Sequence, residues 1–138
     1  MVIYMSKYIL ISGASSGLAQ TLIEELIKQD YIVIAADIKD SLILSDKVIP
    51  LYMDITKEES VINAYNEVLK ITDELYSVIN FAGAVILGSM VELSTNNLEK
   101  IININLVGMY RVNQIFFPLV KKAKGRYINR SSEYGVLD

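Results

Sequence analysis

Glycine and serine residues cluster near the N-terminus, where an apolar run meets a helical pattern. The stretch is Ser12-Gly13-Ala14-Ser15-Ser16-Gly17-Leu18-Ala19. A glycine such as Gly13 permits a sharp turn, and one such as Gly17 lets the backbone approach a phosphate. The N-terminus of the following helix would present unpaired N–H groups to the same anion. The stretch therefore predicts a pyrophosphate-binding loop, although glycine loops of this kind also occur as plain turns.

An acidic residue, Asp37, ends the second apolar run, twenty residues after Gly17. A carboxylate in this place can accept hydrogen bonds from both hydroxyls of an adenosine ribose. The alternative interpretation is an ordinary polar residue that opens a loop. Because the same charge would repel a 2'-phosphate, the pattern favours NAD over NADP, and Lys39 weakens that preference slightly.

The composition excludes several kinds of chemistry. The chain has no Cys and no His, so a thiolate nucleophile, a disulfide and a histidine base are absent, and no metal site is expected. A net charge of -3 does not indicate the excess of basic residues that is typical of nucleic-acid-binding proteins. Charged residues, Asn or Gly interrupt every apolar run, so no membrane span is expected. Residues 1–5 do not resemble a secretory signal, and we expect a cytoplasmic protein.

Apolar runs alternate with helical patterns along the chain. The expected strands are 8–12, 31–36, 48–53, 76–83 and 126–129. An apolar stripe predicts a helix over 17–29. Thr56 and Glu59 have the spacing of a capping box for a second helix, and Ser94 is the expected cap of a long apolar helix over 94–117. Pro118 should kink that helix or end its regular part.

These elements predict one domain over residues 1–138. The strands are apolar without alternation, which is typical of parallel strands covered by helices on both faces, and the hydrophobic content of 52% agrees. Short connections of this kind require right-handed crossovers. The expected fold is therefore α/β, a Rossmann-like doubly wound parallel sheet of order 3-2-1-4-5 that is truncated after the fifth strand. That last strand should lie at an exposed edge.

Five motifs in order make the chain similar to the N-terminal, cofactor-binding part of a short-chain dehydrogenase/reductase. The family's glycine motif resembles Ser12, Gly13, Gly17 and Ala19, and its Asp-Val pair resembles Asp54-Ile55. Its Asn-Asn-Ala-Gly resembles Asn80-Phe81-Ala82-Gly83, its helical Asn-Leu-x-Gly resembles Asn105-Leu106-Val107-Gly108, and its Asn-Ile-Ser-Ser resembles Asn129-Arg130-Ser131-Ser132.

The resemblance implies hydride transfer between NAD(H) and a carbonyl or alcohol. Ser132 would bind the substrate oxygen, and Asn105 would be the relay Asn of the catalytic group. The implied cofactor-binding residues are Ser12, Gly13, Ser15, Ser16, Gly17, Leu18, Asp37, Ile38, Asp54, Ile55, Asn80, Ala82 and Gly83. The family's Tyr-x-x-x-Lys does not occur: Tyr134 is too close to Ser132, and Asp138 follows it by four. We therefore expect little activity from these 138 residues.

Other functions stay open from the sequence. The chain could be a non-catalytic dinucleotide-binding module or a truncated remnant. The family's helix at 94–117 packs against its twin, which implies a homodimer or a higher homo-oligomer. The carbonyl or alcohol substrate cannot be identified, because the family's substrate loop lies outside the matched part.

Overall fold

The computed structural model describes residues 6–40 and 43–131. Its strands are β1 (Tyr8–Ser12), β2 (Ile32–Asp37), β3 (Val48–Tyr52), β4 (Ser77–Asn80) and β5 (Arg126–Asn129). Its helices are α1 (Gly17–Lys28), α2 (Glu58–Leu69), α3 (Thr95–Ile102) and α4 (Met109–Ala123), with a π-helical segment η1 (Asn103–Gly108) between α3 and α4.

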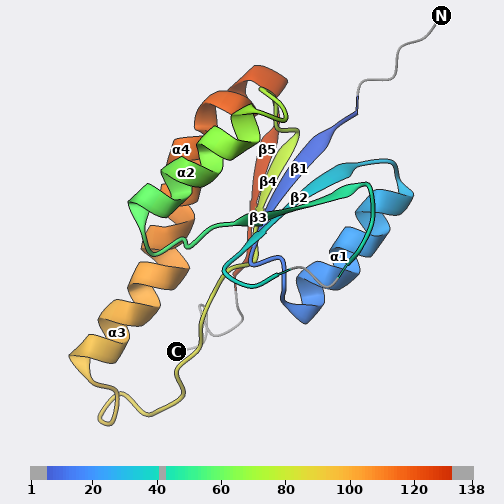
Figure 1. The fold of residues 1–138 in the computed structure, drawn as a ribbon. Coiled ribbons are helices and arrows are strands. Elements are labelled where there is room, and N and C mark those ends of the chain that lie inside the picture. The colour runs from blue at the N-terminus through green and yellow to red at the C-terminus, as the bar shows by residue number, and fades with distance from the viewer. Residues whose placement is uncertain (1–5, 41–42, 132–138) are drawn as a thin grey trace, which may run out of the picture.

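The sheet has five parallel strands in the order β3-β2-β1-β4-β5, which confirms the predicted topology (Figure 1). Its register aligns the carboxyl ends of the inner strands. Ser12 of β1 pairs with Ala36 of β2 and Asn80 of β4, and Asn80 pairs with Asn129 of β5. The loops that follow these strands therefore leave the sheet side by side.

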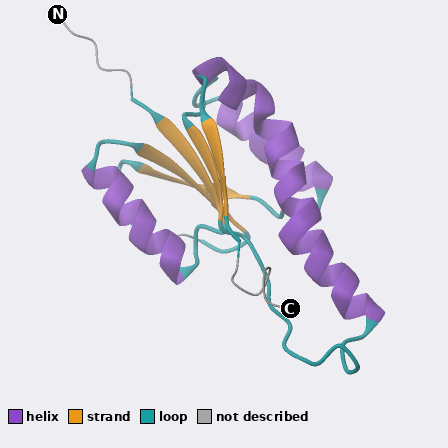
Figure 2. Ribbon diagram, turned by 180° about the vertical axis from the view of Figure 1, so that it is seen from behind, coloured by secondary structure: helices purple, strands orange, loops and turns teal. Residues whose placement is uncertain are grey.

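Helices cover both faces of the sheet: α1 lies on one face, and α2 and α4 lie on the other (Figures 1 and 2). In β1, Ile9 and Ile11 belong to the core under α1, whereas Leu10 belongs to the core under α2 and α4. This two-sided burial explains the unbroken apolar pattern of the central strands. At the edge, β5 is more exposed, and half of the Ile128 side chain meets solvent.

The helix predicted over 94–117 consists of three segments, α3, η1 and α4. The Ser94 hydroxyl accepts a hydrogen bond from the Asn97 amide at 3.1 Å, which confirms the predicted cap. Pro118 does not end the regular helix, which continues to Ala123. The π turn at 103–108 was not predicted. It contains the buried Gly108, where an added Cβ would lie only 2.8 Å from Cδ1 of Ile55.

The predicted capping box of α2 is wrong. The helix begins at Glu58 with Lys57 as its N-cap, and no side chain bonds the cap. Thr56 lies one residue too early, and its hydroxyl donates instead to Asp54 Oδ1 at 2.6 Å. An N-cap hydroxyl must accept from an amide of the first turn, and Thr56 stands before the N-cap position, so its hydroxyl bonds the loop instead of the helix end.

Candidate functional site

A cavity of about 460 Å³ lies at the carboxyl edge of the sheet, above β1, β2 and β4. Nine of the predicted site residues line it: Gly13, Ser15, Ser16, Asp37, Ile38, Asp54, Ile55, Ala82 and Gly83. These residues come from four separate loops, which the parallel register brings together. A cavity where the strand order reverses is the usual ligand position in sheets of this type.

Gly13 forms the turn that directs the chain from β1 into this cavity. Its φ of +69° is a conformation that other residues rarely adopt. An added Cβ would also meet the backbone of the next loop, at 2.4 Å from the Ala82 nitrogen. The glycine is therefore required twice, by its own backbone angle and by the close approach of the loop after β4.

The N-terminus of α1 opens toward solvent beside this turn. The Ser16 hydroxyl accepts from the Ala19 amide at 3.3 Å, and the Gln20 amide donates to the Ser16 carbonyl. The amides of Gly17 and Leu18 have no acceptor among the described residues. No atom lies within 4 Å of a Cβ built at Gly17. An anion therefore has both open space and unpaired donors at this helix end.

Asp37 is hydrogen-bonded to the glycine loop. Its Oδ2 accepts from the amide and the hydroxyl of Ser15, at 2.9 and 2.7 Å, and its Oδ1 accepts from the Lys39 amide at 3.1 Å. Partial burial raises the pKa of Asp37, but the Ser15 and Lys39 hydrogen bonds outweigh it and hold the pKa below its ordinary value. The carboxylate is thus charged at neutral pH. Ser15 and Lys39 thus already occupy three acceptor positions of the carboxylate.

Several hydrogen bonds hold the loop after β3, among them bonds from Thr56 and Arg111. Asp54 accepts from the amide and hydroxyl of Thr56, and this hydroxyl bond is the main cause that lowers the Asp54 pKa. Arg111 of α4 donates to the carbonyl of Ile55. Because Ile55 lines the cavity, this contact from α4 helps to position the part of the cavity wall that Ile55 forms.

Asn80 lies beneath the cavity in a buried polar network. Its Oδ1 accepts from the Ser12 hydroxyl at 3.2 Å, and its Nδ2 donates to Asn113 Oδ1 and Asn129 Oδ1 at 2.8 and 2.9 Å. Ser12 and Asn80 are both almost completely buried. Their side chains therefore join β1, β4, β5 and α4, and neither residue lines the cavity.

Asn105 holds the loop after β4 against the π turn. Its Nδ2 donates to the Ala84 carbonyl and its Oδ1 accepts from the Ala84 amide, both at 2.8 Å. This pair of bonds fixes the loop that carries Ala82 and Gly83. Asn105 itself does not line the cavity.

Several cavity residues did not belong to the predicted site, and Ser132 lies outside the described residues. The additional lining residues are Lys39, Met53, Thr56, Phe81, Ala84, Ile104 and Arg130. All of them lie within two residues of a predicted one, Ile104 next to Asn105, so their proximity in sequence is the signal that could have found them. Ile104 reaches the site only through the packing of η1.

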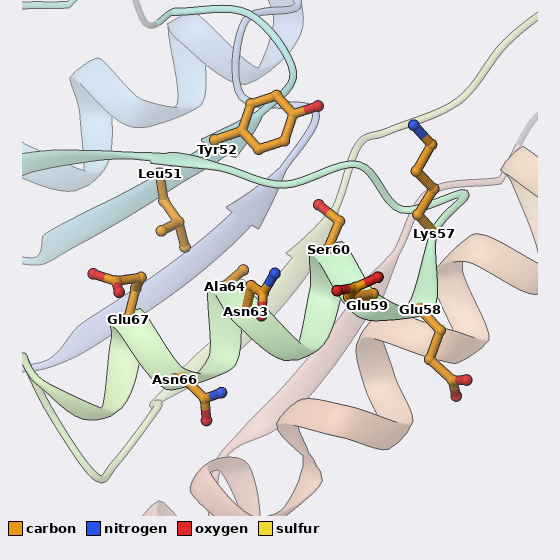
Figure 3. A pocket seen from close by; sticks show the side chains of 10 residues that line it. All are labelled: Leu51, Tyr52, Lys57, Glu58, Glu59, Ser60, Asn63, Ala64, Asn66 and Glu67. Atoms are coloured by element: carbon orange, nitrogen blue, oxygen red, sulfur yellow. The ribbon is translucent and has the colours of Figure 1, made fainter.

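A second and larger hollow, of about 840 Å³, lies between β3 and α2 (Figure 3). Leu51 of β3 points toward α2 there, whereas Tyr52 points to the other side of its strand. The lining from α2 includes Glu58, Glu59 and Glu67. These carboxylates would repel a phosphate, and none of the predicted site residues lines this hollow. Size alone therefore does not identify the site.

Two further properties concern only the described part of the chain. No helix in it is long and apolar enough to cross a membrane. No group of three or more acidic side chains in it is arranged to hold a metal ion.

Comparison with known proteins places these features in a family. The model of the family described as short chain dehydrogenase matches residues 7–138. Retinol dehydrogenase 7 from Mus musculus is 31% identical over 137 residues, which cover 94% of this chain and 43% of the relative. Short-chain dehydrogenase/reductase family 9C member 7 from the same organism is 33% identical, with 94% and 44% covered. The chain thus spans less than half the length of these relatives.

Solved structures show the same fold. A short chain dehydrogenase from Leptospira borgpetersenii with bound NAD+ superposes with a TM-score of 0.88 at 23% identity, covering 99% of this chain and 57% of that one. ElxO with bound NADP gives a TM-score of 0.84 at 25% identity, covering 96% and 58%. These two structures hold different dinucleotides, NAD+ in the first and NADP in the second.

Proposed function

The chain belongs to the short chain dehydrogenase family, and we propose that it binds NAD(H) for hydride transfer between the nicotinamide and a carbonyl or alcohol group. One observation carries the proposal: Asp37 and Ser16, the N-cap of α1, line the same cavity, and Ser15 beside Ser16 is hydrogen-bonded to Asp37. A carboxylate near the unpaired amides of a helix N-terminus suits the ribose and the pyrophosphate of an adenosine diphosphate unit.

The residues of the cavity would divide the dinucleotide between them. The amides of Gly17 and Leu18, with the Ser15 and Ser16 loop, would hold the pyrophosphate. Asp37 and Ile38 would contact the adenosine ribose, and Asp54 with Ile55 would border the adenine. The backbone of Ala82 and Gly83, fixed through Ser12, Asn80 and Asn105, would line the path toward the nicotinamide.

Ribose binding makes a specific demand on Asp37. The Oδ2 atom already accepts from both the amide and the hydroxyl of Ser15. A ribose hydroxyl can take a position on Oδ2 when the Ser15 hydroxyl rotates away, which a single side-chain torsion allows. The Ser15 hydroxyl then becomes available to a phosphate oxygen. We infer that it exchanges one acceptor for another as the dinucleotide enters.

The bound nicotinamide would supply or accept the hydride. Of this chain's residues, Ser132 would hydrogen-bond the substrate oxygen, and Asn105 would keep the neighbouring loop in place. No Tyr in the sequence is followed by a Lys four residues later. The positioned proton donor of general acid catalysis, typically worth about 10²- to 10⁴-fold, is therefore unassigned in these residues. We propose that they bind NADH and turn it over slowly.

The substrate class rests on the family and on its members' names. One relative is named retinol dehydrogenase 7, and retinol is an alcohol. This supports an alcohol or the corresponding carbonyl compound as substrate for the proposed reaction.

Cofactor titration tests the first half of the proposal. Calorimetry should show NADH binding more tightly than NADPH, because Asp37 accepts from a ribose hydroxyl and repels a 2'-phosphate. Asp37→Ala should weaken NADH binding by about tenfold, as expected for a lost hydrogen bond to a charged group. It should therefore reduce the gap in affinity between NADH and NADPH. Asp40→Ala, which removes the same charge from a residue that does not line the cavity, should leave the gap unchanged. Equal affinities in the unmutated chain would show that Asp37 does not contact the ribose.

Turnover tests the second half. NADH absorbance can be followed with ketones, aldehydes and quinones, using the unmutated chain and Ser132→Ala. We expect binding with little oxidation. Rapid turnover that falls with Ser132→Ala would identify an acid within these residues, and Tyr134 would be the first to substitute.

A further inference from the structure

Four residues that line the cavity lie in a row at the carboxyl edge of the sheet. The register aligns Ala36, Ser12, Asn80 and Asn129 on β2, β1, β4 and β5. The next residues along these strands are Asp37, Gly13, Phe81 and Arg130, and all four line the cavity. Neighbouring strands lie about 4.8 Å apart, so Asp37 and Arg130 are separated by three strand spacings of about 14 Å.

The backbone directs the Arg130 side chain toward the middle of this row. Asn129 bonds Asn80 and Asn113 on the face covered by α4. Successive side chains of a strand point to opposite faces, and the Arg130 amide continues the β4–β5 ladder by donating to the Asn80 carbonyl at 3.2 Å. Arg130 therefore points to the face covered by α1. Its Nη1 reaches back over β4 to the Phe81 carbonyl at 3.4 Å.

The guanidinium of Arg130 has no carboxylate partner among the described residues. The two carboxylates that line the cavity already accept hydrogen bonds from other residues. Asp37 accepts from Ser15 and Lys39, and Asp54 accepts from Thr56. The hydrogen bond to the Phe81 carbonyl is long at 3.4 Å, so it holds the side chain weakly. A full positive charge on Arg130 and Ser16, the N-cap of α1, thus line one cavity together with Gly13 and Phe81.

We propose that Arg130 binds the pyrophosphate of the dinucleotide from the β5 side, opposite the N-terminus of α1. The inference rests on the proposed function and deepens it by assigning a cofactor-binding residue. The guanidinium fork suits two phosphate oxygens, and a modest rotation would exchange the Phe81 carbonyl for them. The pyrophosphate is then held from both sides, by backbone amides and by a side-chain cation.

The competing possibility is that Arg130 contacts the nicotinamide half, since a guanidinium also stacks on flat rings. ADP-ribose separates the two, because it retains the pyrophosphate and lacks the nicotinamide. A contact to the pyrophosphate strengthens NADH and ADP-ribose alike, whereas a contact to the ring strengthens NADH alone.

The test is calorimetric titration of NADH and ADP-ribose into the unmutated chain, Arg130→Gln, Arg130→Lys and Arg126→Gln. Arg126 is the matched control, because it begins the same strand, is exposed and carries the same charge at the other end of the sheet. Arg130→Gln should weaken both ligands by about fivefold, as expected for one exposed charge contact. Arg130→Lys should lose less, and Arg126→Gln should change neither affinity. Added salt should reduce the gap between the unmutated chain and Arg130→Gln.

The outcomes separate the two proposals. Loss of NADH affinity with unchanged ADP-ribose affinity overturns the pyrophosphate contact and leaves dinucleotide binding intact. Equal effects of Arg130→Gln and Arg126→Gln overturn it too, since the charge would then act only at long range. An unmutated chain that binds neither ligand refutes the proposed function and this inference together. Unchanged thermal unfolding of Arg130→Gln would show that lost affinity does not come from unfolding.

Discussion

Replacing Gly13 with alanine should destabilise the fold through a clash that no side chain can relieve. The added Cβ would lie 2.4 Å from the Ala82 nitrogen, 2.6 Å from the Ala82 Cα and 2.7 Å from the Phe81 carbonyl carbon. All three are backbone atoms of the loop after β4. That loop is held by the double hydrogen bond between Asn105 and Ala84, so it can move only if this contact also shifts.

Two costs add at Gly13. A residue with a side chain at φ of +69° costs about 1 to 2 kcal/mol, and overpacking against fixed backbone costs about 1 to 3 kcal/mol. The free energy of unfolding should therefore fall by about 2 to 5 kcal/mol. For 138 residues, an unfolding entropy of about 2.1 cal/mol/K per residue gives a decrease in Tm of about 7 to 17 °C.

Gly17→Ala is the matched control, because an added Cβ there has no neighbour within 4 Å and φ lies outside the left-handed region. Its free energy of unfolding should equal that of the unmutated chain or exceed it by up to about 1 kcal/mol. The same methyl would fill the space assigned to the pyrophosphate, so NADH binding should weaken. The assay is thermal and urea unfolding followed by circular dichroism. A Gly13→Ala chain that melts with the unmutated one, or a Gly17→Ala chain that melts equally early, would refute this reasoning.

Three further predictions concern the core, pH and self-association. Phe116→Ala should cost about 3 to 5 kcal/mol in urea unfolding because Phe116 is fully buried, whereas Phe117→Ala should cost far less because half of that side chain is exposed; similar costs would contradict the described packing. Asp37→Asn should destabilise the chain at neutral pH, and the difference should begin to shrink at about pH 4 and vanish once the pH falls below the depressed pKa of Asp37, because the folded carboxylate is then protonated as well; a difference that persists in stronger acid would exclude charge as its cause. The exposed apolar side chains of Leu106 and Tyr110 favour self-association, so Leu106→Glu should shift the sedimentation coefficient toward the monomer, and an unmutated chain that is already monomeric at high concentration would refute it.

The order of the sheet could be predicted from sequence because its cause is local and repetitive. Apolar runs too short for helices alternate with helical stripes, and right-handed crossovers leave few ways to arrange them. The position of Asp37 after β2 followed from the same pattern, since a polar residue at the carboxyl end of a parallel strand must lie at the edge of the sheet.

The bonding of the site could not be predicted, because it depends on which groups compete for each donor. Thr56 has the spacing of a helix cap, yet the helix begins at Glu58 and the Thr56 hydroxyl donates to Asp54 in the loop. Ser15 sits in a loop expected to face phosphate, yet its amide and hydroxyl both donate to Asp37. Sequence spacing describes one chain segment at a time, whereas these choices arise between segments.

Residue types and their spacing determined the family, the glycine turn and the carboxylate beside it, because each of those needs a particular residue at one place in the chain. Only the tertiary structure decided that Asn80 is buried among Ser12, Asn113 and Asn129 and that Arg130 faces the cavity. Asn129 and Arg130 are adjacent in sequence, and the pleat of β5 sends one into the sheet's polar network and the other to the opposite face. The physical reason is that the face a side chain takes depends on the register of its strand, and the register is set by packing across the whole sheet.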